Sequence, residues 1–189
     1  MATLGELAVV CGLVATASAT AVPRLLAGLG DARVAGAARY VSSRLAESRL
    51  DAIARSREVA VRFVRANGTY SFTVYVDGNR NGVLTRDIQR GVDTPVRGPE
   101  MLEDNFHGVV FGTQPGLPAI DSSSAAPGSD PIRLGSGNSV SFSALGSATS
   151  GTIYLTGPSR AQYAVRIFGV TGKIRVYHFS SESQKWFPM

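Results

Sequence analysis

The apolar residues in the first third of the chain form two successive patterns. No charged residue occurs at positions 7–22, and beyond Pro23 apolar side chains continue at near-helical spacing up to Ile53, with Arg, Asp and Glu on the other faces. This indicates one helix of about fifty residues, which at roughly 1.5 Å per residue spans about 75 Å. Pro23 should bend the helix without ending it. Because a domain of this size cannot cover such a length, half of the helix must project.

The apolar segment at residues 4–22 has three physical interpretations. Ala17-Ser18-Ala19 and Ala19-Thr20-Ala21 are typical of signal-peptide cleavage sites, although no Lys or Arg precedes them. A transmembrane helix needs roughly 20 apolar residues, and the segment nearly reaches that length only if Glu6 is counted in it. The Glu6 carboxylate would then lie in hydrocarbon and would need a cation from another chain as its partner. A buried core helix fits the many Ala, Thr and Ser residues but leaves Glu6 unexplained.

Behind this helix the pattern changes to the period-two alternation of β-strands. Apolar and polar residues alternate at 59–63 and 70–76, and Asn67-Gly68 between them is a strong hairpin signal. Further strands are expected at 108–111, 139–144, 152–156, 162–168 and 173–179. The stretch 113–138 is rich in Pro, Gly and Ser and is typical of a long surface loop.

The predicted fold class is α+β. A long N-terminal α-helix, with a membrane half at residues 1–23 and an amphipathic half at 24–56, packs on a C-terminal antiparallel β-sheet domain at 57–189. We expect one twisted sheet on the apolar stripe of the amphipathic half.

Charge and cysteine content narrow the range of partners. The net charge of +5 is carried almost wholly by Arg and favours anionic partners. The single cysteine, Cys11, excludes an intrachain disulfide. His107 and His178 have no Cys or carboxylate at ligand spacing in the sequence, so we expect neither catalysis nor a small-molecule substrate.

Residues 77–87 resemble the first part of an EF-hand calcium loop, with oxygen side chains at alternate positions and Gly at the sixth. The side chains that could bind calcium are Asp77, Asn79, Asn81 and Asp87. Asp87 falls at position eleven instead of twelve, however. The alternative is an Asn/Gly turn that binds no metal.

Three basic residues lie on the last two predicted strands. Lys173 and Arg175 share one strand face by period two, and Arg166 belongs to the preceding strand. Two or three phosphate contacts would give weak, salt-sensitive binding to DNA. The alternative is an exposed basic strand without a ligand.

The order of these features resembles that of pilins and pseudopilins, the subunits of bacterial filaments. Their hallmark is Phe-Thr-Leu-x-Glu, an apolar run, a proline and an amphipathic helix, matched here by Ala2-Thr3-Leu4-Gly5-Glu6, residues 7–22, Pro23 and residues 24–55. Near the C-terminus, Tyr163-Ala164-Val165-Arg166, residues 169–176 and Trp186 resemble the final hairpin of the GspH/FimT family. That family comprises minor pseudopilins of type II secretion and minor pilins of type IV pili.

The resemblance implies a structural function. It suggests a single-pass protein of the bacterial inner membrane, with its C-terminal domain in the periplasm, that joins other pilin or pseudopilin subunits in a filament. Glu6 would pair with the N-terminal amine of a neighbouring subunit, and Thr3 and Pro23 belong to the same assembly motif. Met1-Ala2 stands where the family has a leader ending in Gly followed by Phe, so cleavage and N-methylation are not read from this chain.

Two other functions remain open. Gly172-Lys173-Ile174-Arg175 resembles the Gly-Arg-x-Arg pattern of the FimT branch, whose members take part in DNA uptake. The hairpin of such a minor pilin would hold DNA through Lys173, Arg175 and Arg166. The third possibility is a secreted soluble β protein with a cleaved signal segment.

Overall fold

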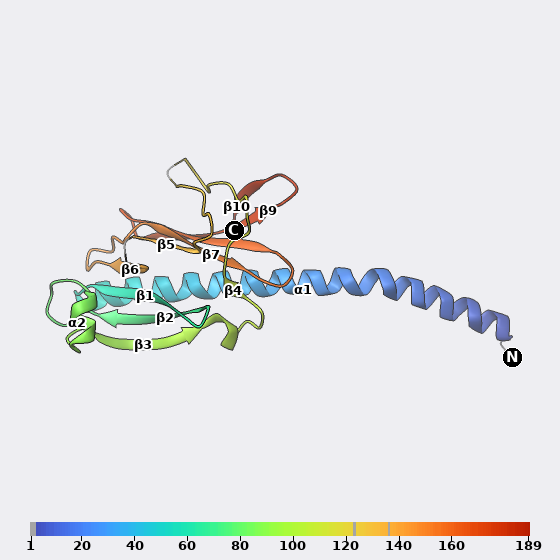
Figure 1. The fold of residues 1–189 in the computed structure, drawn as a ribbon, viewed down its shortest axis with the longest axis horizontal. Helices are drawn as coiled ribbons and strands as arrows, with labels where there is room; N and C mark the ends of the chain where they lie inside the picture. The colour runs from blue at the N-terminus through green and yellow to red at the C-terminus, as the bar shows by residue number, and fades with distance from the viewer. Residues whose placement is uncertain (1–2, 123, 136) are drawn as a thin grey trace.

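One long helix extends far beyond the β-strands in the computed structural model, which describes residues 3–122, 124–135 and 137–189 (Figure 1). Within this long helix, the side chains that the structure describes do not include those at positions 4, 7, 10, 17 and 20–27. The helix α1 (Leu4–Arg55) contains 52 residues and continues through position 23. It ends where Ser56 turns into the left-handed region, with φ of 49°. The prediction of one uninterrupted helix is confirmed.

The strands form two antiparallel sheets, whereas we predicted one. The first sheet, in the order β3-β2-β1-β6, contains β1 (Val59–Ala66), β2 (Thr69–Val76), β3 (Thr94–Met101) and β6 (Ser139–Phe142). The second, in the order β10-β9-β8-β7-β4 with β5 also paired to β7, contains β4 (Val110–Phe111), β5 (Ile132–Leu134), β7 (Gly151–Thr156), β8 (Gln162–Phe168), β9 (Lys173–Ser180) and β10 (Lys185–Pro188). Two short helices, α2 (Thr85–Gln89) and η1 (Leu102–Asp104), flank β3 in the chain.

The hairpin between β1 and β2 is confirmed with the predicted turn. Asn67 and Gly68 have φ angles of 51° and 82°, and the two residues that flank them, Ala66 and Thr69, are paired. Positive φ at both central residues is what a tight type I′ turn requires, and its twist matches that of the two strands.

Three strands were missed, one because it contains prolines on an exposed edge and two because they are too short for an alternation to be recognised. β3 is an edge strand, mostly exposed, and contains Pro95 and the Gly98-Pro99 pair. β5 has three residues inside the predicted loop 113–138, and β10 has four. Runs this short have too few positions for a period to be recognised.

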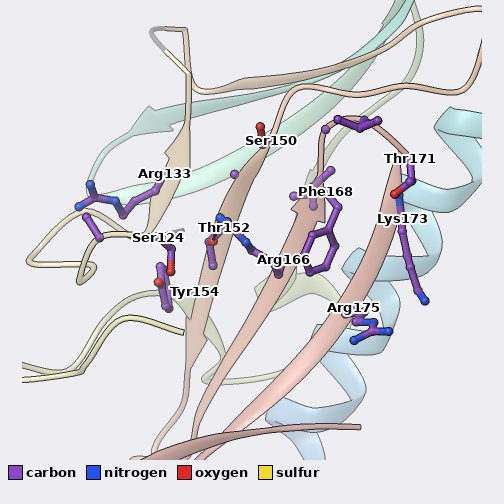
Figure 2. Close-up of a pocket in the computed structure, with 15 residues that line it drawn as sticks. Ser124, Arg133, Ser150, Thr152, Tyr154, Arg166, Phe168, Thr171, Lys173 and Arg175 are labelled. Atoms are coloured by element: carbon purple, nitrogen blue, oxygen red, sulfur yellow. Dashed lines mark hydrogen bonds between the residues drawn. The ribbon is translucent and has the colours of Figure 1, made fainter. Parts of the chain in front are cut away.

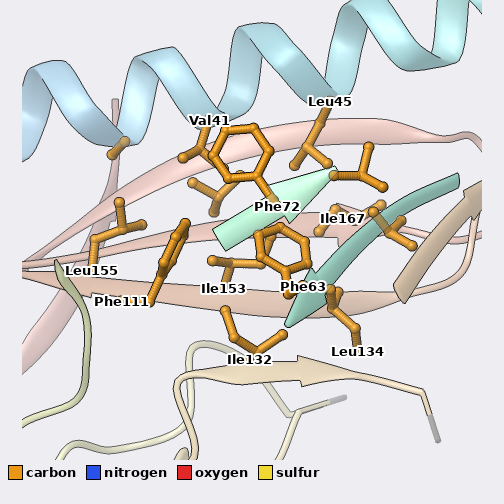
Figure 3. Close-up of a cluster of buried hydrophobic side chains, with 14 of the residues drawn as sticks. Val41, Leu45, Phe63, Phe72, Phe111, Ile132, Leu134, Ile153, Leu155 and Ile167 are labelled. Atoms are coloured by element: carbon orange, nitrogen blue, oxygen red, sulfur yellow. The ribbon is translucent and has the colours of Figure 1, made fainter. Parts of the chain in front are cut away.

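The core lies between the second half of α1 and the inner face of the second sheet (Figure 3). Val41 and Leu45 on α1 are buried together with Ile153, Leu155 and Ile167 of β7 and β8. The coarse prediction, a helix packed on an antiparallel β domain, is therefore confirmed.

Aromatic side chains join the first sheet to the second. Phe63 of β1 and Phe72 of β2 both contact Phe111 of β4, with ring centroids 5.5 and 6.3 Å apart and nearly perpendicular planes. Such edge-to-face contacts between aromatic rings are favourable beyond the area that they bury. Both sheets therefore share one apolar core.

The β domain begins to cover α1 at Gly30. The described residues of the helix between 3 and 29 are all exposed, and Gly30 is buried against Ser159. Next to it, the Tyr163 hydroxyl donates a 3.1 Å hydrogen bond to Asp31 Oδ1. Burial and this carboxylate raise the pKa of Tyr163 to about 12, so the phenol stays protonated and keeps donating.

Among the residues that the structure describes, no helix combines the length and the apolar character needed to cross a membrane.

The placement of α1 predicts that two leucine substitutions on this helix lower the stability of the protein by very different amounts. Leu45 is 1% exposed and Leu50 is 61% exposed. Leu45→Ala should lower the free energy of unfolding by about 2–5 kcal/mol because it leaves a cavity in the core. Leu50→Ala should change it by less than about 0.5 kcal/mol. Equal losses in chemical denaturation of the two variants would contradict this orientation of α1.

Candidate functional site

A capping box joins two of the residues predicted for assembly at the start of α1. The Glu6 N–H donates to Thr3 Oγ1 at 3.3 Å, and the Thr3 N–H donates to Glu6 Oε2 at 2.9 Å. These bonds satisfy amide groups that a helix end otherwise leaves unpaired, and the helix dipole favours a negative charge in this turn. The third predicted residue, Pro23, lies in α1 with its side chain outside the described residues.

The sequence contained a signal for this box that our prediction overlooked. Thr-x-x-Glu before an apolar helix is a typical capping box. We had explained Glu6 only by a partner chain, whereas the structure supplies a local hydrogen-bonding partner, Thr3. The assembly role of Glu6 stays a prediction, and it would come in addition to the role of Glu6 in capping the start of the helix.

The structure brings together the residues predicted for calcium binding. Asp77 is 2% exposed, and its carboxylate accepts hydrogen bonds from the backbone N–H groups of Asn79 and Gly82 at 3.0 and 2.8 Å. The Asp87 carboxylate accepts from the side-chain amides of Asn81 and Asn79 at 3.0 and 3.4 Å. These bonds, chiefly that of Asn81, hold the pKa of Asp87 below its ordinary value.

A buried carboxylate outside the predicted set completes the loop. Asp93 is buried and accepts from the N–H groups of Gly78 and Leu84 at 3.0 and 2.8 Å. In the described part of the chain, no group of three or more His, Cys, Asp or Glu side chains is placed to hold a metal ion. Because the carboxylates face N–H donors, the geometry favours the Asn/Gly turn, and calcium binding stays a prediction.

A hollow of about 750 Å³ lies over the outer face of the second sheet, the face turned away from the core (Figure 2). We call it the basic pocket and define it by six of its lining residues: Arg133, Thr152, Tyr154, Arg166, Lys173 and Arg175. All three residues predicted to bind DNA lie in it. Figure 2 shows Arg166 and Thr152 in the centre, Arg133 on one side, and Lys173 and Arg175 on the other.

The register of four strands builds this pocket. Arg133 of β5 pairs with Thr152 of β7, Thr152 with Arg166 of β8, and Arg166 with Arg175 of β9. Residues directly opposite each other in a sheet share a face, so these residues form one row across four strands. Arg133 was missed because it belongs to the strand hidden in the predicted loop.

Arg166 is recessed at the centre of the row. It is 8% exposed, donates from Nη1 to Thr152 Oγ1 at 3.1 Å, and has its Nε 3.6 Å from Asp121 Oδ2. The ring of Phe168 lies 5.7 Å from the Arg166 guanidinium and 6.0 Å from that of Arg175. The ring thus holds both cations by cation–π contacts.

Tyr154 forms part of the pocket wall next to the chain's single tryptophan. Its hydroxyl is buried and makes no hydrogen bond of good geometry among the described residues, although the Thr152 side chain lies close to it. Burial raises the pKa of the phenol against a smaller lowering by Arg133, so it stays protonated. The Trp186 ring lies 5.9 Å from that of Tyr154, and Trp186 Nε1 donates to Pro118 O at 3.0 Å.

Comparison of the chain with family models, curated proteins and solved structures finds no match. The expected membership of the GspH/FimT family therefore stays a prediction.

Neither histidine is among the described residues that line the basic pocket, although His178 lies on β9 three residues after Arg175. His107 Nδ1 is 3.6 Å from Glu103 Oε1, a carboxylate that the sequence argument did not pair with it, and its side chain is 90% exposed. His178 stacks on Phe187 with ring centroids 5.6 Å apart. The expectation that the chain has no catalytic activity stays a prediction.

The hydrogen bonds in the loop predict that Asp77 stabilises the fold without a metal. In the presence of a chelator, Asp77→Asn should lower the free energy of unfolding by about 1–3 kcal/mol, because an amide group replaces a carboxylate oxygen that accepts a buried N–H bond. Asp104→Asn, at an exposed position, is the matched control. A loss that appears only when calcium is added would indicate a calcium site instead.

Proposed function

We propose that this chain is a minor subunit of a pilus-like filament, of the type IV pilin or type II secretion pseudopilin kind. It assembles through the first half of α1. The observation that carries the proposal is the part of α1 that extends away from the β domain before Gly30 (Figure 1). At 1.5 Å per residue, this free half is about 40 Å long.

The free half exposes apolar side chains that water does not favour. Val9, Leu13 and Val14 are 63%, 65% and 60% exposed, in a segment without charge. An isolated helix gains little stability in water from its own hydrogen bonds, and exposed apolar surface of this size marks an interaction site. Helices of the same kind, from other subunits, would bury these side chains in a filament core.

Glu6 would select the position of the neighbouring subunit. Between stacked helices, a carboxylate is costly unless a cation meets it. The N-terminal amine of a neighbouring pilin subunit would supply that cation. Thr3 would keep the carboxylate oriented through the capping box, because its N–H donates to Glu6 Oε2.

The cellular location follows from the same proposal. Before assembly, the free half would lie in the bacterial inner membrane and the β domain in the periplasm. On assembly the free half would move into the filament core, and the β domain would face outward.

Two substitutions separate the charge of Glu6 from its capping role. Glu6→Gln keeps a capping group of the same length but removes the charge, and it should abolish recovery of the chain in sheared filaments from its native host. Thr3→Ala removes the capping hydroxyl but keeps the charge, and it should still assemble.

Circular dichroism provides the control for these variants, because both should keep the helical content of the wild type. Normal incorporation of Glu6→Gln into filaments would overturn the proposal.

The single cysteine offers a second test. Cys11 is exposed on the free half of α1, so a maleimide should label it rapidly in the purified, unassembled chain outside a membrane. In assembled filaments the neighbouring helices should protect it, and the labelled fraction should fall at least about tenfold. A cysteine placed at exposed Arg55, in an otherwise Cys11→Ser chain, should label equally in both states. Equal labelling of Cys11 in both states would argue against burial of the free half.

A further inference from the structure

We propose that the basic pocket binds a small molecule that carries more than one phosphate or carboxylate group.

The pocket is strongly cationic. Its described lining residues include four cations, Arg133, Arg166, Lys173 and Arg175, and no carboxylate. Arg166 and Arg175 are directly opposite each other on β8 and β9, an arrangement of like charges that destabilises a sheet. An anion bound between these cations would offset this repulsion.

The shape of the pocket suits a small ligand. A volume of about 750 Å³ lies within the range typical of small-ligand sites. Arg166 lies recessed at its centre, with cations on both sides (Figure 2). Duplex DNA is a thick rod with its phosphates on the convex outer surface. Those phosphates would contact the exposed Lys173 and Arg175 but would not reach Arg166. A small ligand with several anionic groups reaches the centre and both sides.

The pocket wall also contains a hydrogen-bond donor that the fold leaves poorly satisfied. The Tyr154 hydroxyl is buried there, and among the described residues the Thr152 side chain lies close to it but makes no hydrogen bond of good geometry with it. A buried hydroxyl without a well-formed hydrogen bond costs free energy, and an oxygen atom of a bound anion would supply a better acceptor. Thr152, which accepts from Arg166, lies in the same wall.

Asp121 adds a prediction specific to this site. Its carboxylate lies 3.6 Å from Arg166 Nε and partly neutralises the charge that a ligand would contact. Since the carboxylate opposes an incoming anion, replacing it with an amide should strengthen binding. An electrostatic surface without a defined site would respond to the loss of the Asp121 charge no more than to the loss of a carboxylate elsewhere on the chain.

The full-length chain can be titrated with pyrophosphate and, separately, with citrate at constant ionic strength. Trp186 is the only tryptophan and lies beside Tyr154, so its fluorescence reports on the pocket. The two probes distinguish phosphate from carboxylate as the preferred group. We expect at least one of them to give a saturable change in Trp186 fluorescence, with one ligand bound per chain. If neither probe gives a saturable change, the proposal is wrong.

Four variants locate the binding. Arg175→Gln and Lys173→Gln should each weaken binding about tenfold, as the loss of a charge-assisted contact does. Asp121→Asn should tighten it severalfold. Lys185→Gln removes the same charge from an exposed position on β10, outside the pocket, and should change the affinity by less than about twofold. Thermal unfolding of each variant shows whether it is folded.

The variants and a DNA control add two results that would overturn the proposal. If Lys185→Gln weakens binding as much as Arg175→Gln, the anion binds the net charge of the chain and not the pocket. If a short DNA duplex binds through Lys173 and Arg175 while pyrophosphate and citrate do not bind, the face is a surface for nucleic acid. The filament proposal is independent of both, because it depends on the free half of α1.

Discussion

Burial of one stripe of α1 by both sheets is the interaction on which the rest of the structure depends. Val34, Val41 and Leu45 lie in the same apolar core as residues from each sheet, and every square ångström of apolar surface removed there stabilises the fold by about 25 cal/mol. The fit is close. A Cβ added at Gly157, in the turn after β7, would lie 2.6 Å from Val34 Cγ2. The helix therefore places the β7–β8 hairpin and, through it, the second sheet.

The same packing divides α1 into two halves with different surroundings. From Gly30 onward the helix is held by the β domain, and Asp31 is tied to Tyr163. Before Gly30 the described residues are exposed, and the uncharged segment lies there. A helix with one end anchored in a domain presents its other end away from that domain. This geometry supports the proposal that the free half packs with helices of other subunits.

The packing of the second sheet on α1 also determines which side chains lie on the outer face of that sheet. Ile153, Val165 and Ile167 face the core, so the alternating residues Thr152 and Arg166 must face outward. Strand register then aligns Arg133 and Arg175 with them. The apolar core and the basic pocket are thus two faces of the same strands, and the packing of one face determines the row of cations on the other.

Local patterns in the sequence determined the long helix, its end near residue 55, the β1–β2 hairpin and most strands, because each depends on residues close together in the chain. Lys173 and Arg175 could be placed on one face for the same reason. Thr3 and Glu6 could have been recognised as a capping box from their spacing alone. The division into two sheets, the strands β3, β5 and β10, and the contributions of Arg133, Asp93 and Tyr154 were decided only by the tertiary structure. These features arise from pairings between distant segments, and a single sequence shows which residues alternate but not which strands become neighbours.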